Sequence, residues 1–351
     1  MATLKTKVRK GLKLFVILLV FTMLALLFFS DPEPGKKFSL NIIKKLSYAF
    51  KKIDPFFLLF SLLCWVIHVL LDSCRISLLC QGVSDKWCDL KTSIEIILTG
   101  AFLAAVTPFQ TGGFPVQLYL LKKAKISYGK GSLIILLRAI FYSIMMLVLF
   151  PFLFPILIKE TEIKSINILS KYSIIVYSII ILIITFILIK PEIIKRLVYR
   201  LIKKKRKKGT KLIFKLFKEI EEMKEGFWFF VKKKKWHSIG SFFLTFITYI
   251  PYFFIASLLL KGIGIEESFF KIAFLQLVVI FFSFFSPTPG ATGVTEGVFA
   301  VLFLGIIGRN LLGVFTILWR FFTFYLSALI GGILVLDVLK LGDLEIDRKR
   351  I

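Results

Sequence analysis

Histidine, cysteine and acidic residues are scarce in this chain of 351 residues, which contains 2 His, 4 Cys and 21 Asp+Glu. The cysteines form no CxxC pair and show no spacing typical of metal ligands. They are Cys64, Cys74, Cys80 and Cys88, and the first two lie in an apolar segment, where Cys usually packs as a small hydrophobic residue. No HExxH, GxSxG or P-loop motif is present. We therefore expect no metal, no cofactor and no soluble catalytic site.

Basic and apolar residues are abundant instead. The chain is 57% hydrophobic, includes 40 Phe, and carries 48 Lys+Arg for a net charge of +27. Its mean hydropathy is +0.85. A soluble domain would not have so high a hydropathy, and neither would a nucleic-acid-binding domain with this positive charge. The apolar residues gather in long runs and the cations flank them. This composition argues against a soluble enzyme, a secreted disulfide scaffold and a nucleic-acid module. It predicts an all-α, multi-pass protein of a prokaryotic cytoplasmic membrane.

Eight apolar segments are long enough to enter a membrane. Six are uninterrupted and are predicted to cross it as single helices, namely 14–29, 55–80, 132–158, 172–189, 237–260 and 310–337. The other two, 92–121 and 268–308, are interrupted by Pro and Gly clusters, which break a helix because Pro lacks an N–H and Gly gains backbone freedom. Broken backbone at membrane depth needs protein or water around it. We therefore expect two re-entrant hairpins, each built from two half-helices.

The charges of the connecting segments predict the orientation. Segment 191–236 contains 17 Lys+Arg and 5 Asp+Glu, so the positive-inside rule places it in the cytoplasm. Alternation from there puts both chain ends in the cytoplasm and makes the hairpins enter from opposite faces. Segment 36–53 and the basic segment are each expected to contain a helix on the membrane surface, the latter against anionic head groups. One transmembrane domain is predicted over 1–337, followed by a cytoplasmic tail over 338–351.

The two breaks share a sequence pattern, Thr107-Pro108-x-x-Thr111-Gly112 in the first and Thr288-Pro289-x-x-Thr292-Gly293 in the second. An arginine follows each break at similar spacing inside an apolar span, Arg138 in the first case and Arg320 in the second. The order of spans, surface segment and hairpin also recurs. Together these features predict an inverted repeat, with one copy over about 14–158 and the other over about 172–337.

Inverted repeats with broken helices are typical of transporters, whose substrate sites lie at the repeat interface. Half-helix N-termini present unpaired N–H groups that suit phosphate or carboxylate. Glycine lets the backbone approach a ligand closely, and an arginine near mid-membrane marks a cavity, an ion pair or an anionic ligand. The predicted substrate-binding residues are Arg138, Arg320, Glu296, Gln117, Thr107, Thr111, Gly112, Gly113, Thr288, Gly290, Thr292 and Gly293.

Structural roles are the alternatives for the charged residues among these. Either arginine can form an ion pair or clamp backbone carbonyls instead of binding a ligand. Glu296 can pair with Arg320 or Arg309, take up a proton, or stabilise the start of its own helix as an acid near the helix dipole.

Other polar residues in the apolar segments leave two interpretations open. Gln110 and Gln117 near the first break can bind a head group or satisfy freed backbone groups. His68, Asp72 and Arg75 fall on one stripe of segment 55–80. A proton relay is one interpretation of that stripe, and a plain Asp72–Arg75 ion pair is the favoured one.

The break regions are similar to the two signature regions of a known family. Thr107-Pro108-Phe109-Gln110-Thr111-Gly112-Gly113-Phe114-Pro115 and Pro287-Thr288-Pro289-Gly290-Ala291-Thr292-Gly293-Val294-Thr295-Glu296 resemble those of the lysylphosphatidylglycerol synthase transmembrane-region, or flippase-like, family, over about 10–340. The resemblance implies a multispan bundle that moves or presents anionic or lipid-linked lipids. Full-length synthases add a cytoplasmic aminoacyl-transfer domain, which we expect to be absent because 14 residues follow Asp337. Some relatives carry a charged pair where this chain has Pro115 and Gln117. The head-group preference of those relatives therefore does not carry over to this chain.

The leading functional hypothesis is a transporter that flips an anionic phospholipid or a lipid-linked intermediate between leaflets. The chain lacks an ATPase motif, so movement would be facilitated or driven by an ion or proton gradient. One alternative is a membrane-embedded, lipid-modifying transferase with Glu296 as general base. An enzyme is the weaker hypothesis, because the sequence offers no nucleophile and no set of metal ligands for it. Another is an accessory subunit of a separate glycosyl- or aminoacyl-transferase. The expected partners are membrane lipids, with no nucleic acid.

Overall fold

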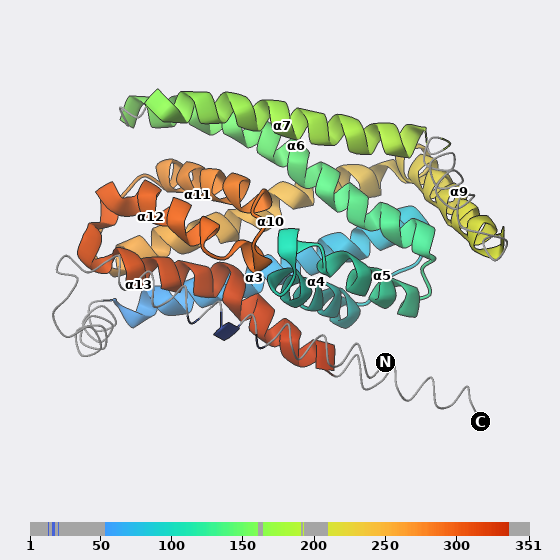
Figure 1. Cartoon of the computed structure of the whole chain (residues 1–351), viewed down its shortest axis with the longest axis horizontal. Helices are drawn as coiled ribbons and strands as arrows, with labels where there is room; N and C mark the ends of the chain where they lie inside the picture. Colours follow the sequence, from blue (N-terminus) through green and yellow to red (C-terminus); the bar gives the residue numbers. More distant parts are fainter. Residues whose placement is uncertain are drawn as a thin grey trace. The chain divides into compact units, whose positions relative to one another are not determined.

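A computed structural model describes residues 53–160, 164–190, 192 and 210–336, together with the isolated positions 13, 16, 17 and 20. All regular structure in these residues is helical (Figure 1). The predicted span 14–29, the surface helix 36–53 and the tail 338–351 lie outside the described ranges or are described only at those isolated positions. The helices are α3 (Pro55–Ser84), α4 (Leu90–Ala105), α5 (Gly113–Lys123), α6 (Tyr128–Glu160), α7 (Lys164–Ile189), α9 (Thr210–Lys232), α10 (Lys235–Gly262), α11 (Phe269–Phe284), α12 (Val294–Ile307) and α13 (Arg309–Arg320).

Five helical stretches of the described chain are long and apolar enough to cross a membrane. They are Pro55–Ser84, Tyr128–Phe152, Lys235–Gly262, Pro289–Ile307 and Arg309–Leu336. Four of them coincide with predicted spans, and the fifth belongs to the second half of segment 268–308. Helix α11 has 16 residues, fewer than the ~20 that a perpendicular crossing needs. The predicted span 172–189 lies within α7, whose apolar stretch in the described residues is Ile175–Phe186.

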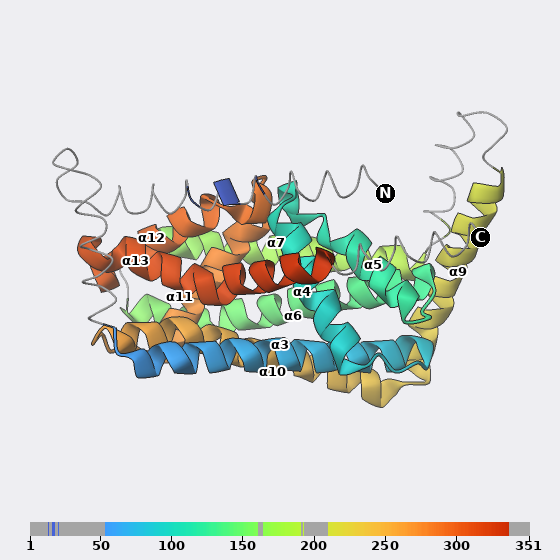
Figure 2. The ribbon, with the colours of Figure 1, turned by 90° about the horizontal axis from the view of Figure 1, so that it is seen from below.

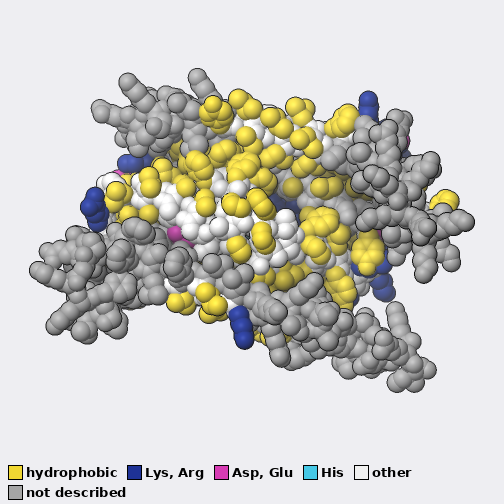
Figure 3. All heavy atoms as spheres, in the orientation of Figure 1, with side chains coloured by type: hydrophobic (Ala, Val, Ile, Leu, Met, Phe, Trp, Pro, Cys, Tyr) yellow, Lys and Arg dark blue, Asp and Glu magenta, His cyan; other side chains and the backbone are white. Residues whose placement is uncertain are grey.

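Hydrophobic side chains cover much of the visible face of the described chain (Figure 3). Large apolar residues such as Leu59 on α3, Leu182 on α7 and Val301 on α12 are more than half exposed. Contiguous apolar surface of this extent is unusual on a soluble monomer, and lipid chains would cover it. The exposed surface therefore agrees with the long apolar helices.

The chain forms two compact units that interleave along the sequence. Unit 1 comprises 53–69, 97–116 and 249–336 of the described residues, and unit 2 comprises 70–96 and 117–248. Both Pro- and Gly-rich breaks belong to unit 1, whereas Arg138 belongs to unit 2.

Helices α3 and α10 run side by side (Figure 2), and glycines of α10 allow close packing in each unit. In unit 1, a Cβ on Gly262 would lie 3.2 Å from Cβ of Phe57. In unit 2, a Cβ on Gly240 would lie 3.2 Å from a methyl carbon of Leu78. The ring of His68 lies 5.6 Å from that of Tyr249 and 5.5 Å from that of Tyr252, so this histidine packs among aromatic rings.

The core of unit 1 is aromatic where α12 meets α13. The Phe299 ring stacks on Phe303 at 4.0 Å and on Trp319 at 4.3 Å between centroids, and all three side chains are buried. The indole of Trp319 donates to Gln276 Oε1 at 3.0 Å, and Gln276 Nε2 donates to the Phe253 carbonyl at 2.9 Å. These bonds tie α13 to α11 and α10, so the helix that carries Arg320 has a fixed position in unit 1.

Helix α4 packs against the continuation of α13 to Leu336 through glycine. A Cβ on Gly331 would lie 1.8 Å from the carbonyl oxygen of Leu98, far inside van der Waals contact. Gly332 faces the ring of Phe102, with a Cβ distance of 3.2 Å. Phe102 and Val335 are buried in the same cluster. The backbone of the segment before the first break is thus in direct contact with the last described helix.

Unit 2 contains the packed helices α6, α7 and α9. Helix α9 is the amphipathic helix expected in the basic segment, and its Phe214, Trp228 and Val231 are exposed. Lys234 lies just beyond it and donates to Asp85 at 2.6 Å, which holds the pKa of that carboxyl below its ordinary value. Contact of α9 with lipid head groups stays a prediction.

Candidate functional site

The helix breaks at both predicted places, and the two turns follow the same backbone path from the threonine to Gln110 or Ala291. The paths then diverge, because Thr111 is helical with φ/ψ of −74°/−20° and Thr292 is extended with φ/ψ of −62°/137°. Thr107 and Thr288 are extended, with φ/ψ of −124°/144° and −79°/149°. A proline follows each and begins a short 3-10 turn, η1 (Pro108–Gln110) or η3 (Pro289–Ala291). The shared sequence pattern therefore encodes a shared local structure.

Two consecutive residues in each turn adopt left-handed backbone conformation. In η1 they are Phe109 and Gln110, with φ of 52° and 56°. In η3 they are Gly290 and Ala291, with φ of 61° and 57°. Residues other than glycine are rarely found there because Cβ approaches the following carbonyl. Such strained backbone is often stored at functional sites, which marks η1 in particular.

Threonine hydroxyls close both turns. Thr107 Oγ1 donates to the Leu103 carbonyl at 2.7 Å and accepts from the Gly112 N–H at 2.8 Å. Thr288 Oγ1 donates to the Thr292 carbonyl at 2.8 Å, and Thr111 Oγ1 donates to the Pro108 carbonyl at 3.1 Å. These contacts satisfy backbone groups that the broken helices leave open. The hydroxyls of Thr107, Thr111 and Thr288 therefore have a structural role in the turns, and Thr292 takes part through its backbone carbonyl.

The predicted glycines differ in their surroundings. A Cβ on Gly112 would lie 2.6 Å from the Leu103 carbonyl oxygen, and one on Gly113 would lie 2.9 Å from that of Gly100. A Cβ on Gly290 would lie 2.8 Å from a ring carbon of Phe324. Gly293 is exposed, has φ of 88° and has no heavy atom within 4 Å of its Cβ position. Only Gly293, of these four, has the open space that a ligand approaching the backbone requires.

The two breaks lie against each other inside unit 1, where η1 packs on η3. The carbonyl oxygen of Ala105 is 3.2 Å from the Cβ position of Gly290. Gln110 Nε2 donates to the Ser283 carbonyl near the end of α11 at 3.4 Å, so Gln110 satisfies a backbone group. Sequence spacing alone does not predict this contact, because Gln110 and Ser283 are 173 residues apart.

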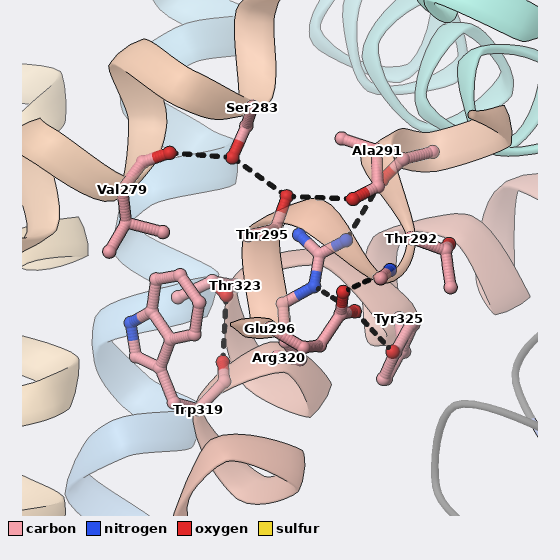
Figure 4. Close-up of polar contacts among 12 residues, drawn as sticks. Val279, Ser283, Ala291, Thr292, Thr295, Glu296, Trp319, Arg320, Thr323 and Tyr325 are labelled. Atoms are coloured by element: carbon pink, nitrogen blue, oxygen red, sulfur yellow. Dashed lines mark hydrogen bonds and ion pairs between the residues drawn. The ribbon is translucent and has the colours of Figure 1, made fainter. Parts of the chain in front are cut away.

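Arg320 forms a buried ion pair with Glu296, one of the two pairings considered for this acid (Figure 4). Arg320 Nε donates to Glu296 Oε1 at 2.9 Å, and Arg320 Nη2 donates to the Gly290 carbonyl at 2.9 Å. Tyr325 Oη donates to Glu296 Oε1 at 2.8 Å, while Glu296 Oε2 accepts from the Gly293 N–H at 2.7 Å. Glu296 is 1% and Arg320 5% exposed. The pair thus links α13, α12 and the η3 turn.

Aromatic rings enclose this guanidinium. Directly after Arg320, residues Phe321–Tyr325 form a π-helical turn, a feature that is frequent at functional sites. The turn places the Phe324 ring 4.3 Å and the Tyr325 ring 5.5 Å from the Arg320 guanidinium carbon. These cation–π contacts add to the ion pair. Tyr325 is a polar partner that sequence reasoning missed.

A second polar link joins α11 to α12 beside η3 (Figure 4). The hydroxyls of Ser283 and Thr295 are 2.7 Å apart, and Thr295 Oγ1 also contacts the Ala291 carbonyl at 3.0 Å. Ser283 Oγ donates to the Val279 carbonyl at 2.7 Å. Neither side chain was predicted, because isolated Ser and Thr in apolar helices carry little signal.

The other predicted arginine, Arg138 on α6, also binds a carboxylate. Its Nη2 donates to Asp72 Oδ2 at 2.8 Å. Asp72 also pairs with Arg75, at 2.5 Å between Oδ1 and Nη2, which confirms the favoured Asp72–Arg75 interpretation. Gln117, on α5, is half-buried and belongs to unit 2 with these three residues. No group of three His, Cys, Asp or Glu in the described residues has the arrangement of a metal site.

The left-handed η3 turn should reject a side chain at Gly290. Gly290→Ala is expected to lower stability by about 1–3 kcal/mol, because alanine is strained at positive φ and its Cβ would collide with Phe324. Gly297→Ala on α12 is the matched control, since its Cβ meets no atom within 4 Å and alanine favours the helix. Thermal unfolding in detergent measures both. Equal unfolding midpoints for the two variants would contradict the role of Gly290.

Long apolar helices, exposed apolar surface and two packed helix breaks define a multi-pass helical membrane protein. Residues 12–331 match the family described as the lysylphosphatidylglycerol synthase transmembrane region, and the chain belongs to that family. It is 25% identical over 250 residues to a UPF0104 membrane protein of Archaeoglobus fulgidus, covering 69% of this chain and 75% of the relative. It is also 28% identical over 306 residues to a UPF0104 membrane protein of Pyrococcus horikoshii, covering 83% and 89%.

Proposed function

We propose that this protein moves an anionic phospholipid or a lipid-linked intermediate between the leaflets of a prokaryotic cytoplasmic membrane, without changing it chemically. The observation that carries the proposal is the contact between η1 and η3. Discontinuous helices whose breaks meet within apolar segments are the architecture of transporter binding sites. Irregular backbone at such depth is tolerated where protein or a water-filled cavity satisfies it.

The proposed topology has six spans and two re-entrant hairpins related as an inverted repeat, with both chain ends in the cytoplasm. The matching backbone of residues 107–110 and 288–291 supports a repeat. The short length of α11, 16 residues, supports a half-helix. Together with the basic segment, which the positive-inside rule would place in the cytoplasm, these features support alternating access between two halves.

The proposed head-group site is the exposed part of the two breaks. Thr111 and Gly293 are exposed there. The buried ion pair of Arg320 and Glu296 stabilises η3 from inside the protein. A head group would approach the hydroxyl of Thr111 and the backbone beside Gly293. In this arrangement Arg320 positions the turn through Gly290, and its charge acts on the substrate only through that turn.

Reconstitution into liposomes tests the proposal. Liposomes contain tail-labelled fluorescent phosphatidylglycerol, and dithionite added outside bleaches only the outer leaflet. We expect the bleached fraction to exceed that of protein-free liposomes, with or without an imposed proton gradient. The Gly297→Ala variant should match the parent protein, and Gly290→Ala should exchange lipid more slowly because η3 is displaced.

Chromatography of the extracted lipids separates the alternatives. Unmodified phosphatidylglycerol after exchange supports transport. A new lipid product formed by the protein would support the lipid-modifying transferase hypothesis and would contradict the transport proposal. Absence of exchange for phosphatidylglycerol, together with co-purification of a transferase from the native membrane, would favour the accessory-subunit alternative.

A further inference from the structure

A second buried charge cluster lies within unit 2, where α3 packs near α6. It consists of Asp72 and Arg75, one turn apart on α3, and Arg138 on α6. Both guanidiniums bind the same carboxylate, through Arg75 Nη2 to Oδ1 at 2.5 Å and Arg138 Nη2 to Oδ2 at 2.8 Å. Within these three residues, two positive charges therefore share one negative charge.

Two donor nitrogens of Arg75 make no hydrogen bond to the described residues. It is 3% exposed, and its Nε and Nη1 are buried with no hydrogen-bond partner among the described residues. A guanidinium cannot lose its charge by deprotonation in a protein, and a buried donor without a partner is costly. An arginine held in this state within an apolar helix calls for an acceptor that arrives from outside the protein.

The cluster around Arg320 differs, because no nitrogen of Arg320 is among the buried atoms of the described residues that lack a hydrogen-bond partner. Arg320 and Glu296 balance in charge, and Arg320 also donates to the Gly290 carbonyl. Aligning Gly112 with Gly293 in the shared pattern places Pro115 where the second half has Glu296. The first half thus lacks a carboxylate after its break, and Arg138 binds Asp72 on α3 instead.

We infer that Asp72, Arg75 and Arg138 form a binding site for a phosphate-type oxyanion, with Arg75 Nε and Nη1 as its donors. Asp72 fixes both guanidiniums by their Nη2 atoms and leaves the remaining N–H groups of Arg75 for the ligand. Charge-assisted bonds from arginine to phosphate oxygens are strong. The Arg138 side chain keeps 17% of its surface exposed, so the cluster is not fully enclosed.

The source of the oxyanion is either the phosphodiester of a lipid head group or free phosphate. The lipid source deepens the proposed transport function and rests on it for the substrate class. Binding is nevertheless measured on the purified full-length protein in detergent, apart from any leaflet exchange. Binding without exchange would reject the transport proposal alone, and exchange without Arg75-dependent binding would reject this inference alone.

Thermal unfolding of the protein in dodecyl maltoside provides the test. The probes are dioleoyl phosphatidylglycerol, dioleoylglycerol (which has the same chains and no phosphate) and inorganic phosphate, the last compared with potassium chloride at equal ionic strength. A ligand that binds only the folded state raises the unfolding midpoint. We expect phosphatidylglycerol to raise it by several degrees and dioleoylglycerol to leave it unchanged. If inorganic phosphate gives the same rise, the site takes the free anion as well.

Arg75→Met should abolish the rise while leaving the midpoint of the probe-free protein unchanged or higher, because it removes an incompletely bonded buried charge and keeps the Asp72–Arg138 pair. Arg309→Gln, which removes an exposed cation at the start of α13, is the matched control and should keep the rise. Arg75→Lys, which keeps the charge with a single donor nitrogen, should reduce it.

Three outcomes would overturn the inference. The first is no midpoint rise in the parent protein with either phosphate probe. The second is an undiminished rise in Arg75→Met or Arg75→Lys. The third is a large loss of stability, or failure to purify, of probe-free Arg75→Met, because that would make Arg75 a structural member of the cluster.

Discussion

Arg320→Met is expected to destabilise the protein by about 3–5 kcal/mol, the usual cost of leaving one partner of a buried ion pair uncompensated. The Glu296 carboxylate would remain 1% exposed in an apolar surrounding and would keep only its bonds from Tyr325 and the Gly293 N–H. The η3 turn would also lose the donor to the Gly290 carbonyl. The measurement is the fraction of monodisperse protein that survives graded heating in detergent.

The double variant Glu296→Gln/Arg320→Met distinguishes the energy of the Arg320–Glu296 interaction from the separate effects of the two side chains. Glutamine can still accept from Tyr325 and from the Gly293 N–H, and no charge is left without a partner. We expect the double variant to recover a substantial part of the lost stability, so that the two substitutions are strongly non-additive. Additive losses would contradict an energetic coupling between Arg320 and Glu296.

Lipid exchange by the same variants tells whether Arg320 also meets the substrate. If Arg320 acts only by holding η3, exchange should follow stability and return in part with the double variant. If its charge binds the head group, exchange should stay abolished in the stable double variant. The second result would restore the ligand role that the sequence suggested for Arg320.

Gly331→Ala is expected to cost about 3 kcal/mol, the upper end of the usual range for overpacking. Its Cβ would lie 1.8 Å from the Leu98 carbonyl oxygen, and a backbone atom in α4 cannot move aside by changing a rotamer. The helix after Tyr325 would have to separate from α4, which carries the backbone into η1. Both the unfolding midpoint and the rate of lipid exchange should fall.

Two other glycines calibrate this effect. Gly332→Ala would approach the Phe102 ring at 3.2 Å, and a side chain can yield, so its loss should be smaller. Gly305→Ala on α12 meets no atom within 4 Å and should be neutral or slightly stabilising. The same loss in all three variants would refute the packing argument, because helix propensity or handling would then explain the data.

Local features of the site could be predicted from the sequence. Pro and Gly break a helix wherever they cluster, so residue type alone was enough to locate both breaks. The Asp72–Arg75 pair was favoured because residues three apart on a helix are neighbours. Glu296 and Arg320 could be suggested as partners because a buried charge needs one, but Arg309 satisfied the same reasoning.

Long-range contacts could not be predicted in the same way. Arg138 binds Asp72, which is 66 residues away, and no pattern distinguishes this pairing from one with a carboxylate elsewhere. Most of the threonines and glycines of the breaks serve the turns themselves, whereas the sequence offered them as ligand contacts. That difference depends on which atoms surround each residue, and residue type does not specify it.

By itself, the sequence determined that this protein is a helical membrane protein with two broken segments and one strongly basic segment. Those properties depend on hydrophobic run length, on charge distribution and on the backbone limits of Pro and Gly, all of which are local. Only the tertiary structure decided that η1 meets η3 and that Glu296 pairs with Arg320. It also decided that two donor nitrogens of Arg75 have no hydrogen-bond partner among the described residues. Burial and partner choice arise from contacts between segments far apart in the chain, so they exist only once the helices have packed.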